Sequence, residues 1–396
     1  MIRQMALRPA YIVAARRTAL GRVGGLHRNR RVEDLAAPIV LAVLKDAGLA
    51  AERVDEVIVG NCAAGGNPAR LIALSAGLPE ATPATTIDQQ CGSGLEAILA
   101  AIRQIGTGEA EIVVAGGAES LSTAPWRIAK PKSLYQTPHF IGMELAGASE
   151  VDEQRPFEAS EALARQRGIS RQQQDAFALK SHLRAGSARE ARRFVGEIVP
   201  LRAESDEARD QSAVEPDLRD LERLSPFQPP KGTLTPGNTS AMHDGAAMVM
   251  VVSEIAWGEM GKPPALRLVG NAAQGVGPSD EALAPLAAMQ KLYGRLNGFD
   301  RSVVGVVEMS EASAAQVIAL AGTMGFAEDI INPDGGAIVR GHPLGAAGAV
   351  LIVRLFSRMV RGKGDDRPKF GAATLGAIGG LGLAALFERV EAAGSA

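Results

Sequence analysis

Two segments of the chain share one layout, and this repeat is the strongest constraint on the fold. The segment "CGSGLEAILAAIRQI", which starts at Cys91, and the segment "HPLGAAGAVLIVRLF", which starts at His342, each place one reactive side chain before small residues and an apolar helical pattern. Such an internal repeat indicates two related halves. A pseudo-twofold axis between the halves would bring both helix starts toward one centre. We therefore expect Cys91 and His342 to face each other.

The segments around this repeat predict an α/β fold, because short β-branched apolar runs alternate with helical patterns. The helix after Cys91 is expected to run to about Thr107, and a second helix over residues 170–185 has Ser170 as its N-cap. Buried strands are predicted in "DEVIVGN" (55–61), in "AEIVVAGGAES" (110–120, broken at Gly116-Gly117) and in "TSAMHDGAAMVMVVSE" (239–254), and a strand-turn-strand hairpin in "KFGAATLGAIGGLGLAALFE".

Composition excludes several classes of protein. A hydrophobic content of 46% with 22% charged residues describes a soluble globular chain that can bury a large core. The net charge of −2 gives no support for a nucleic-acid or membrane partner. Two cysteines do not make a disulfide framework, and no Cys/His pair has metal-ligand spacing. Because the N-terminus has no continuous apolar stretch and no run is long enough to span a membrane, we expect a cytoplasmic protein.

Cys91 and His342 are candidates for nucleophilic catalysis. The positive end of a helix dipole stabilises a thiolate, so a cysteine at a helix start is expected to have a lowered pKa. The structural alternative is that Cys91 is a small buried apolar residue, but Gln89 and Gln90 are unusual neighbours for one. His342 taken alone fits a core histidine that is hydrogen-bonded to the backbone. Together with Cys91, it is better explained as half of a Cys–His catalytic couple.

With these motifs, the sequence resembles the thiolase family over essentially its full length. The resemblance implies a five-layered α/β/α/β/α core of two pseudo-symmetric halves, formed by residues 1–119 plus 241–262 and by residues 263–396. Residues 120–240 would form an inserted loop domain that covers coenzyme A, and the protein would be a homodimer or homotetramer. The segments that carry the resemblance are "ARRTALGR", "NPARLIALSAGLP", "QQCGSGLEA", "VVAGGAES", "SRQQQDAFA", "GTLTPGNTSAMHDGAA", "EMSEASA", "GGAIVRGHPLGAAGA" and "ATLGAIGGLG".

The resemblance also implies roles for individual residues. Cys91 would attack an acyl-CoA thioester to form an acyl-enzyme, with His342 as the activating base. The backbone N–H groups of Cys91 and of the turn near Ile378 would form an oxyanion hole. Ser240 and Phe227 fall at or beside positions that contact the pantetheine arm of CoA. Acyl-CoA and CoA would be substrates, and no cofactor would be bound permanently.

Three positions depart from the family pattern. The family's Asn-Glu-Ala-Phe motif reads "SEAS", so that Ser310 stands in place of an asparagine that holds a water for a second oxyanion hole. Pro156 and Phe157 replace a His-Met pair, which implies a reshaped acyl pocket. Gly376 replaces a second cysteine that moves the proton at the acyl α-carbon. General acid–base catalysis contributes roughly 10²–10⁴-fold, so carbon–carbon chemistry should be slow unless another group replaces this cysteine.

The only other thiol, Cys62, follows the strand at 55–61. We hypothesise that Cys62 reaches the site and takes over part of the proton transfer. The alternative is a buried cysteine at the end of a strand.

Three functions are compatible with the sequence. The first is a thiolase-type acyl-CoA C-acyltransferase. The second is a decarboxylative condensing or acyl-transfer enzyme of the same superfamily, in which loss of a carboxyl group creates the carbanion and Gly376 is tolerated. The third is a non-catalytic acyl-CoA-binding protein that keeps only the fold.

Overall fold

In the computed structural model, residues 7–138, 140–141, 155–202, 208–212, 216–362, 364 and 367–392 are described. The expectation of a cytoplasmic protein rests partly on residues 1–6, which lie outside this description. The strands of the N-terminal half are β1 (Ala10–Arg17), β2 (Gly21–Arg22), β3 (Glu56–Gly60), β4 (Ala84–Ile87), β5 (Ile112–Glu119) and β8 (His243–Ser253). Those of the C-terminal half are β9 (Ala265–Gly275), β10 (Val304–Met309), β11 (Phe370–Ala377) and β12 (Leu381–Val390).

The order and direction of the strands repeat between the halves. In the first half, β3 pairs with β5 in parallel, and β5, β8 and β1 then follow as antiparallel neighbours. In the second half, β10 pairs with β11 in parallel, and β11, β12 and β9 follow in the same antiparallel manner. The halves join where β1 pairs with β9. The predicted internal duplication and the hairpin of β11 and β12 are therefore confirmed.

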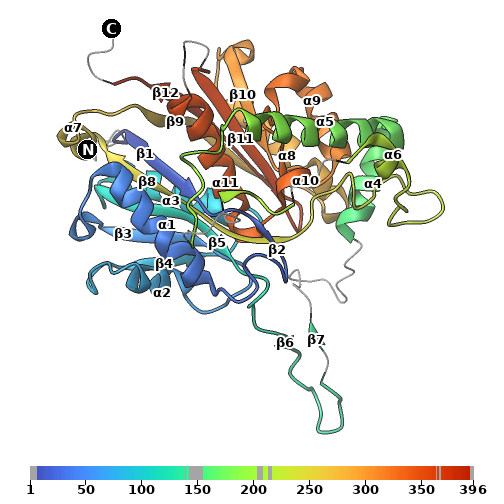
Figure 1. The fold of residues 1–396 in the computed structure, drawn as a ribbon, viewed down its shortest axis with the longest axis horizontal. Coiled ribbons are helices and arrows are strands. Elements are labelled where there is room, and N and C mark those ends of the chain that lie inside the picture. Colours follow the sequence, from blue (N-terminus) through green and yellow to red (C-terminus); the bar gives the residue numbers. More distant parts are fainter. Residues whose placement is uncertain are drawn as a thin grey trace, which may run out of the picture.

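The helices form layers on both sides of the strands (Figure 1). The repeated segments form α3 (Ser93–Thr107) and α11 (Leu344–Phe356), which pack against each other in the middle. One outer layer contains α1 (Val32–Ala47) and α2 (Pro68–Ser75), and the other contains α8 (Ala284–Arg295) and α9 (Ala314–Met324). Shorter elements are η1 (Ala51–Arg53), α7 (Glu254–Glu259), η3 (Pro278–Leu283), η4 (Arg301–Val303), η5 (Glu328–Ile330), α10 (Ala337–Arg340) and η6 (Ser357–Arg361).

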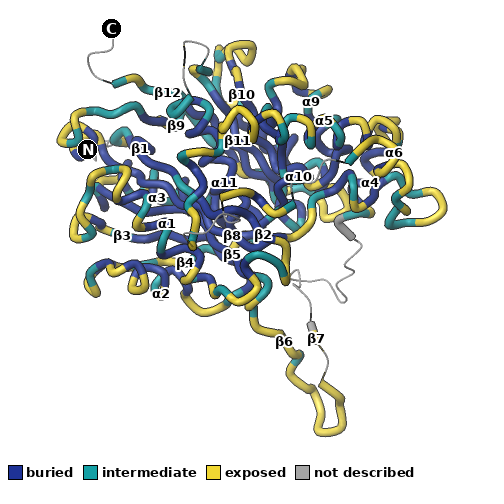
Figure 2. Tube along the Cα trace, in the orientation of Figure 1, coloured by how far each residue is buried: buried dark blue, intermediate teal, exposed yellow. Residues whose placement is uncertain are grey.

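Strand alternation explains the layers, because successive side chains of a strand point to opposite faces. In β3, Val57 and Val59 join the core under α1, whereas Ile58 joins the central core around α3 and α11. In β11, Ala373 and Leu375 face the central core, and Ala372 faces the core under α8 and α9. These two strands are thus buried on both faces, and Figure 2 shows buried residues through the middle of the fold, as the predicted five-layered α/β/α/β/α architecture requires.

The segment between the halves carries helices of its own. These are α4 (Arg155–Arg167), α5 (Arg171–Glu190) and α6 (Leu218–Glu222). Ser170 caps α5 as predicted, since its hydroxyl accepts the Gln173 amide N–H at 3.2 Å, but the helix continues five residues beyond the predicted end. The short strands β6 (Arg127–Ile128) and β7 (Phe140–Ile141) pair in an arm that projects from the body (Figure 1). None of the helices in the described ranges is long and apolar enough to cross a membrane.

One strand prediction was wrong in detail: β5 is not broken at Gly116-Gly117. A Cβ atom at Gly116 would lie 2.1 Å from the Ala247 carbonyl oxygen, and one at Gly117 would lie 2.2 Å from the Gly345 carbonyl oxygen. The two glycines therefore allow β8 and α11 to approach the backbone of an intact strand.

Candidate active site

Cys91 lies in a strained turn two residues before α3. The preceding residue, Gln90, has φ of 53°, a left-handed conformation that is unusual for a residue other than glycine. Ser93 stabilises the turn, because its hydroxyl accepts the Gln89 amide N–H at 2.8 Å and donates to the Gln90 carbonyl at 2.6 Å. The helix begins at Ser93 and ends at Thr107, so the predicted end is correct and the start is displaced by two residues.

The expected lowering of the Cys91 pKa is wrong for the protein without bound substrate. Burial raises the pKa of this thiol to about 12, although hydrogen bonds from the backbone N–H groups of Ile378 and Cys91 act in the opposite direction. Cys91 is only 5% exposed. Loss of hydration therefore disfavours the thiolate more than the positive end of the helix dipole favours it. Cys91 is therefore a neutral thiol at rest.

His342 lies in the corresponding turn before α11. Its N–H donates to the Ala241 carbonyl at 2.8 Å, and its carbonyl accepts the His243 N–H at 3.0 Å. A Cβ atom at Gly341 would lie 2.1 Å from the His243 ring, so only glycine fits between the two histidines. The Ser310 hydroxyl lies 3.3 Å from His342 Nδ1. Burial, followed by the charge of His243, lowers the pKa of His342 to about 4, which keeps the imidazole neutral at pH 7.

Glycines let the two helix starts approach each other. A Cβ atom at Gly94 would lie 2.6 Å from the Gly345 carbonyl oxygen, and one at Gly348 would lie 2.6 Å from the Leu95 nitrogen. This close contact of α3 and α11 brings Cys91 and His342 into the walls of one cavity of about 180 Å³. The structure thus places the two residues at one cavity, as the internal repeat predicts.

Glu119, at the end of β5, joins the segment that follows β3 to the start of α11. One carboxylate oxygen accepts the Cys62 amide N–H and the Gly345 amide N–H, each at 3.0 Å. The other accepts Asn61 Nδ2 at 2.9 Å and the Ala63 N–H at 3.2 Å. Burial raises the pKa of this carboxyl, and the amides of Cys62, Gly345 and Ala63 oppose the shift. We call Glu119 with these four donors the interhelix clamp, because it links the segment after β3 to the start of α11.

Most of the predicted site residues meet at this cavity. Cys91, His342, Ser240, Ile378 and Gly376 all line it. Ser310 does not line the cavity, but its hydroxyl contacts the ring of His342 at Nδ1. Phe227 does not line it either, and instead stacks on Phe157, which does, with ring centroids 4.1 Å apart. The replacement at position 157 therefore shapes this wall of the cavity, with an aromatic pair in support.

Cys62 is placed under the Cys91 turn and is not among the residues that line the cavity. Its thiol donates to the Gln90 carbonyl at 3.0 Å and lies 3.6 Å from the Ser93 hydroxyl. Burial, reinforced by the charge of Glu119, raises the pKa of this thiol far above its usual range. This setting supports the structural alternative for Cys62 more than the catalytic one.

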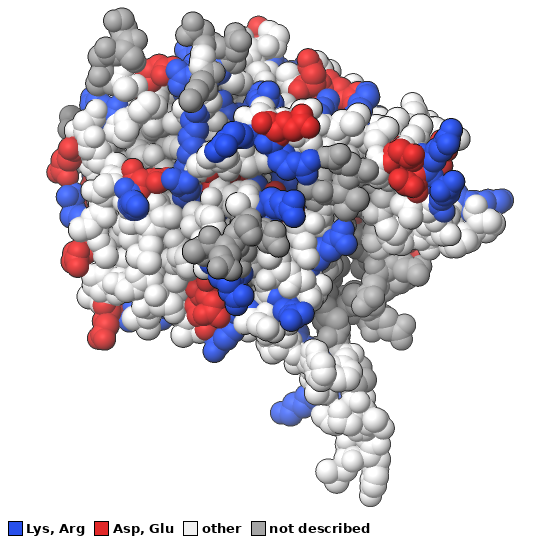
Figure 3. Space-filling model, viewed as in Figure 1, with Lys and Arg blue, Asp and Glu red and all other residues white. Residues whose placement is uncertain are grey.

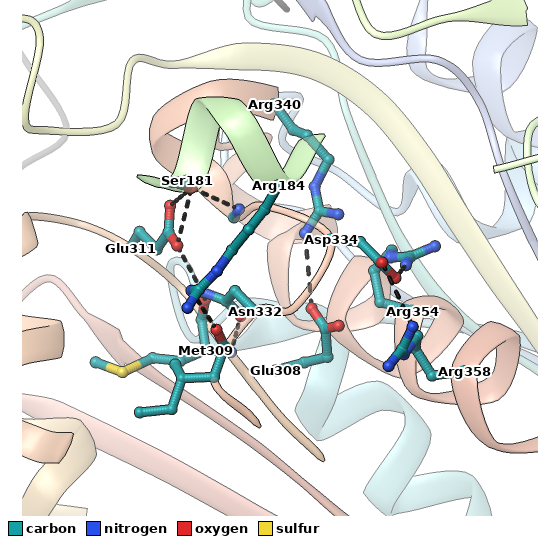
Figure 4. Close-up of polar contacts among 12 residues, drawn as sticks. Ser181, Arg184, Glu308, Met309, Glu311, Asn332, Asp334, Arg340, Arg354 and Arg358 are labelled. Atoms are coloured by element: carbon teal, nitrogen blue, oxygen red, sulfur yellow. Dashed lines mark hydrogen bonds and ion pairs between the residues drawn. The ribbon is translucent and has the colours of Figure 1, made fainter. Parts of the chain in front are cut away.

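A buried polar network lies behind the His342 turn (Figure 4). Arg340 and Glu308 approach to 3.6 Å, and burial raises the pKa of Glu308 to about 7, against the opposing charges of Arg354 and Arg340. The Glu311 carboxylate accepts the Ser181 hydroxyl at 3.0 Å and Asn332 Nδ2 at 2.8 Å. Because Ser181 belongs to α5, this network fixes the inserted segment to the half of the protein that carries His342.

A larger cavity, of about 670 Å³, lies elsewhere and is lined mainly by arginines. Figure 3 shows Lys and Arg side chains gathered across the face of the molecule nearest the viewer. Asp334 occupies the wall of that cavity and pairs with Arg193, Arg354 and Arg358. Of the described residues, no cysteine or histidine lines this cavity, so the smaller cavity with Cys91 and His342 is the better candidate for catalysis despite its size. Within the described ranges, no cluster of side chains could hold a metal ion.

Sequence reasoning missed four residues around the site: Glu119, His243, Glu281 and Gln316. His243 could have been considered, since it is one of only five histidines. Glu281 and Gln316 line the cavity but belong to no pattern that distinguishes them from surface residues. Glu119 is a single carboxylate at a strand end, and the sequence does not reveal its four donors.

Comparisons with known proteins agree with this geometry. The family model described as "Thiolase, N-terminal domain" matches residues 10–255, and "Thiolase, C-terminal domain" matches residues 262–389. A putative acetyl-CoA C-acetyltransferase, VraB, from Staphylococcus epidermidis is 37% identical, covering 96% of this chain and 98% of its own. A probable acetyl-CoA acyltransferase from Staphylococcus aureus is 35% identical, covering 96% and 99%.

Solved structures give the same result. The Bacillus anthracis acetyl-CoA acetyltransferase matches with a TM-score of 0.90 and 31% identity, covering 97% of this chain and all of that one. Human mitochondrial 3-ketoacyl-CoA thiolase matches with a TM-score of 0.87 and 30% identity, covering 98% of this chain.

The fold and the Cys–His cavity define an acyltransferase. The chain belongs to the thiolase family, which confirms the resemblance drawn from its motifs.

Proposed function

We propose that this protein is an acyl-CoA C-acyltransferase in which Cys91 carries the acyl group and His342 moves the proton of its thiol. Acyl-CoA and CoA are its substrates. The observation that carries the proposal is that Cys91 and His342 line one cavity, while the backbone N–H groups of Cys91 and Ile378 approach the sulfur.

Both reactive groups are neutral at rest, and this defines the first step. As the Cys91 sulfur attacks the thioester carbonyl, its proton passes to His342, and the N–H groups of Cys91 and Ile378 stabilise the oxyanion that forms. The Ser310 hydroxyl, 3.3 Å from Nδ1, orients the imidazole and stabilises its charged form. His342 then gives the proton to the departing CoA sulfur, and an acyl-enzyme remains.

Ser240 and the stacked pair of Phe157 and Phe227 are proposed to hold the substrate. Ser240 offers a hydroxyl at the cavity wall, and the aromatic pair offers an apolar surface for a pantetheine arm. The division into halves 1–119 plus 241–262 and 263–396, with 120–240 as a covering segment, is part of this proposal. Phe157 and Ser160, both from the covering segment, support it because they line the cavity. A homodimer or homotetramer is part of the proposal as well.

A decarboxylative enzyme of the same superfamily is the second candidate. Gly376 favours it, because a carbanion made by decarboxylation needs no base at that position. The two functions are separated by supplying purified protein with acetoacetyl-CoA plus CoA and, in parallel, with malonyl-CoA plus acetyl-CoA.

We expect cleavage of acetoacetyl-CoA to acetyl-CoA, abolished in Cys91→Ala. If the protein consumes malonyl-CoA but does not cleave acetoacetyl-CoA, the result would instead favour the decarboxylative enzyme. Binding of CoA without a Cys91 adduct from acetyl, butyryl or longer acyl-CoAs would indicate a non-catalytic binding protein.

A further inference from the structure

The proposed carbon–carbon reaction requires a group that takes or gives a proton at the acyl α-carbon. Carbanion formation beside a thioester is too slow without such a group, which contributes roughly 10²–10⁴-fold in enzymes. Of the residues that line the cavity, only three carry titratable side chains: Cys91, His342 and Glu281. Since Cys91 is esterified in the acyl-enzyme and His342 serves its thiol, Glu281 is the remaining candidate.

Glu281 lies directly over the turn that follows β11. It belongs to η3, is 8% exposed, and one of its carboxylate oxygens accepts the Gly379 N–H at 3.2 Å. Gly379 follows Ile378, whose N–H approaches the Cys91 sulfur. The negative charge of Glu281 also contributes, after burial and the charge of Glu119, to the raised pKa of Cys91. The Glu281 carboxylate and the Cys91 thiol thus line one cavity and interact electrostatically.

The glycines of "LGAIGGLG" allow this placement. A Cβ atom at Gly382 would lie 1.9 Å from the Ala284 carbonyl oxygen, and one at Gly380 would lie 2.5 Å from the Val276 carbonyl oxygen. The segment 276–285 therefore rests against the backbone of the turn and carries Glu281 with it. Ala282, the next residue, is buried against α4 and α9, which fixes η3 from its other side.

Pro285 and Gln316 lie close to the place of the missing side chain at Gly376. A Cβ atom there would lie 3.2 Å from Pro285 Cδ and 3.6 Å from Gln316 Nε2. Gln316 donates to the Ala282 carbonyl at 2.9 Å, while its Oε1 atom is buried without a hydrogen-bond partner. An unpartnered buried acceptor in the wall of a cavity indicates a group that a substrate or a water satisfies. Gln316 and the ionisable Glu281 thus line the same cavity as Gly376.

We propose that Glu281 is the catalytic acid–base residue for the α-carbon, a role that rests on the proposed acyltransferase function. In condensation, the Glu281 carboxylate takes a proton from the α-carbon of the second acyl-CoA. The freed electron pair forms the new carbon–carbon bond at the acyl carbonyl of Cys91, and the carbon–sulfur bond breaks. The proton then passes to the Cys91 sulfur, which restores both groups. In cleavage, protonated Glu281 gives its proton to the α-carbon as the carbon–carbon bond breaks.

The test separates proton transfer at carbon from acylation at sulfur. Exchange of the α-protons of acetyl-CoA is followed in D2O by mass spectrometry, and acylation of Cys91 is followed by exchange of labelled CoA into acetyl-CoA. In Glu281→Gln, the carboxamide oxygen can still accept the Gly379 N–H but cannot take a proton. We expect α-proton exchange to fall roughly 10²–10⁴-fold, with CoA exchange within about threefold of wild type. Asp280→Asn, which removes the same charge from the adjacent exposed residue, is the matched control.

Each other outcome overturns the proposal in a recognisable way. If Glu281→Gln keeps α-proton exchange within about threefold, Glu281 is not the acid–base group, and a loss in Cys62→Ser would assign the role to Cys62. If both exchanges fall together, Glu281 only positions the turn of Ile378. If wild-type protein exchanges CoA but no α-protons, the proposed carbon–carbon reaction itself fails, and the role of Glu281 fails with it.

Discussion

The interhelix clamp gives the most informative prediction about how the two halves hold the site. In Glu119→Gln, an amide NH2 replaces one of the two oxygens, and each oxygen accepts two N–H groups at 2.9–3.2 Å. Two donors therefore lose their acceptor whichever way the amide turns. Each buried donor left unpaired costs about 1–3 kcal/mol. Because the neutral amide also avoids the cost of burying a charge, we expect a net loss of about 2–4 kcal/mol.

Hydrogen exchange of the Cys62, Ala63 and Gly345 amides measures this loss where it occurs. At about 1.4 kcal/mol per factor of ten, protection should fall roughly 30- to 700-fold. CoA exchange should fall in parallel, because His342 lies in the turn directly before α11, close to Gly345. Glu111→Gln is the control, since Glu111 pairs with Arg8 at a half-exposed site, where an ion pair contributes at most about 1 kcal/mol. Equal protection in the two variants would refute the clamp.

Three further predictions concern packing, specificity and pH. Gly117→Ala should lose more than about 3 kcal/mol of stability or fail to fold, because its Cβ would lie 2.2 Å from the Gly345 carbonyl oxygen. Gly376→Ala, with its Cβ 3.2 Å from Pro285 Cδ, should cost only about 1 kcal/mol. Thermal unfolding of the two variants tests this difference, and equal losses of stability would contradict the geometry. Phe157→Ala should enlarge the cavity and raise the kcat/KM ratio of long to short acyl-CoAs, and an unchanged ratio would show that Phe157 does not limit chain length. Since burial lowers the pKa of His342 to about 4, its protonation should reduce CoA exchange only as the pH falls toward that value, and an acid limb near pH 6.5 would contradict a buried imidazole.

The sequence was sufficient for the fold and for the meeting of Cys91 and His342 at one cavity, because both depend on patterns that repeat. The two helix starts at Cys91 and His342 are recognisable by their glycines and by the apolar spacing that follows. The continuous apolar run in β3 likewise predicts a buried strand. The same reasoning failed at Gly116-Gly117, where glycine marks a close approach of α11 from a distant part of the chain and not the end of a strand.

The electrostatics of the site could not be predicted from local sequence. The helix start at Cys91 predicts a lowered pKa, but the burial that outweighs it comes from residues of both halves. Glu281 lies in "PSDEAL", which resembles a charged surface loop until the turn at 376–382 is packed against it. Its importance depends on a contact between residues far apart in sequence, which no single motif contains.

The central claim is that Cys91 carries the acyl group. Brief incubation of the protein with acetyl-CoA, followed by rapid acid quenching and mass spectrometry of the peptides, tests this claim most directly. We predict an acetyl group on the peptide that contains Cys91, lost on adding CoA and strongly reduced in His342→Ala. Acetylation of the Cys62 peptide instead, or no adduct on either cysteine while acetoacetyl-CoA is still cleaved, would contradict the account.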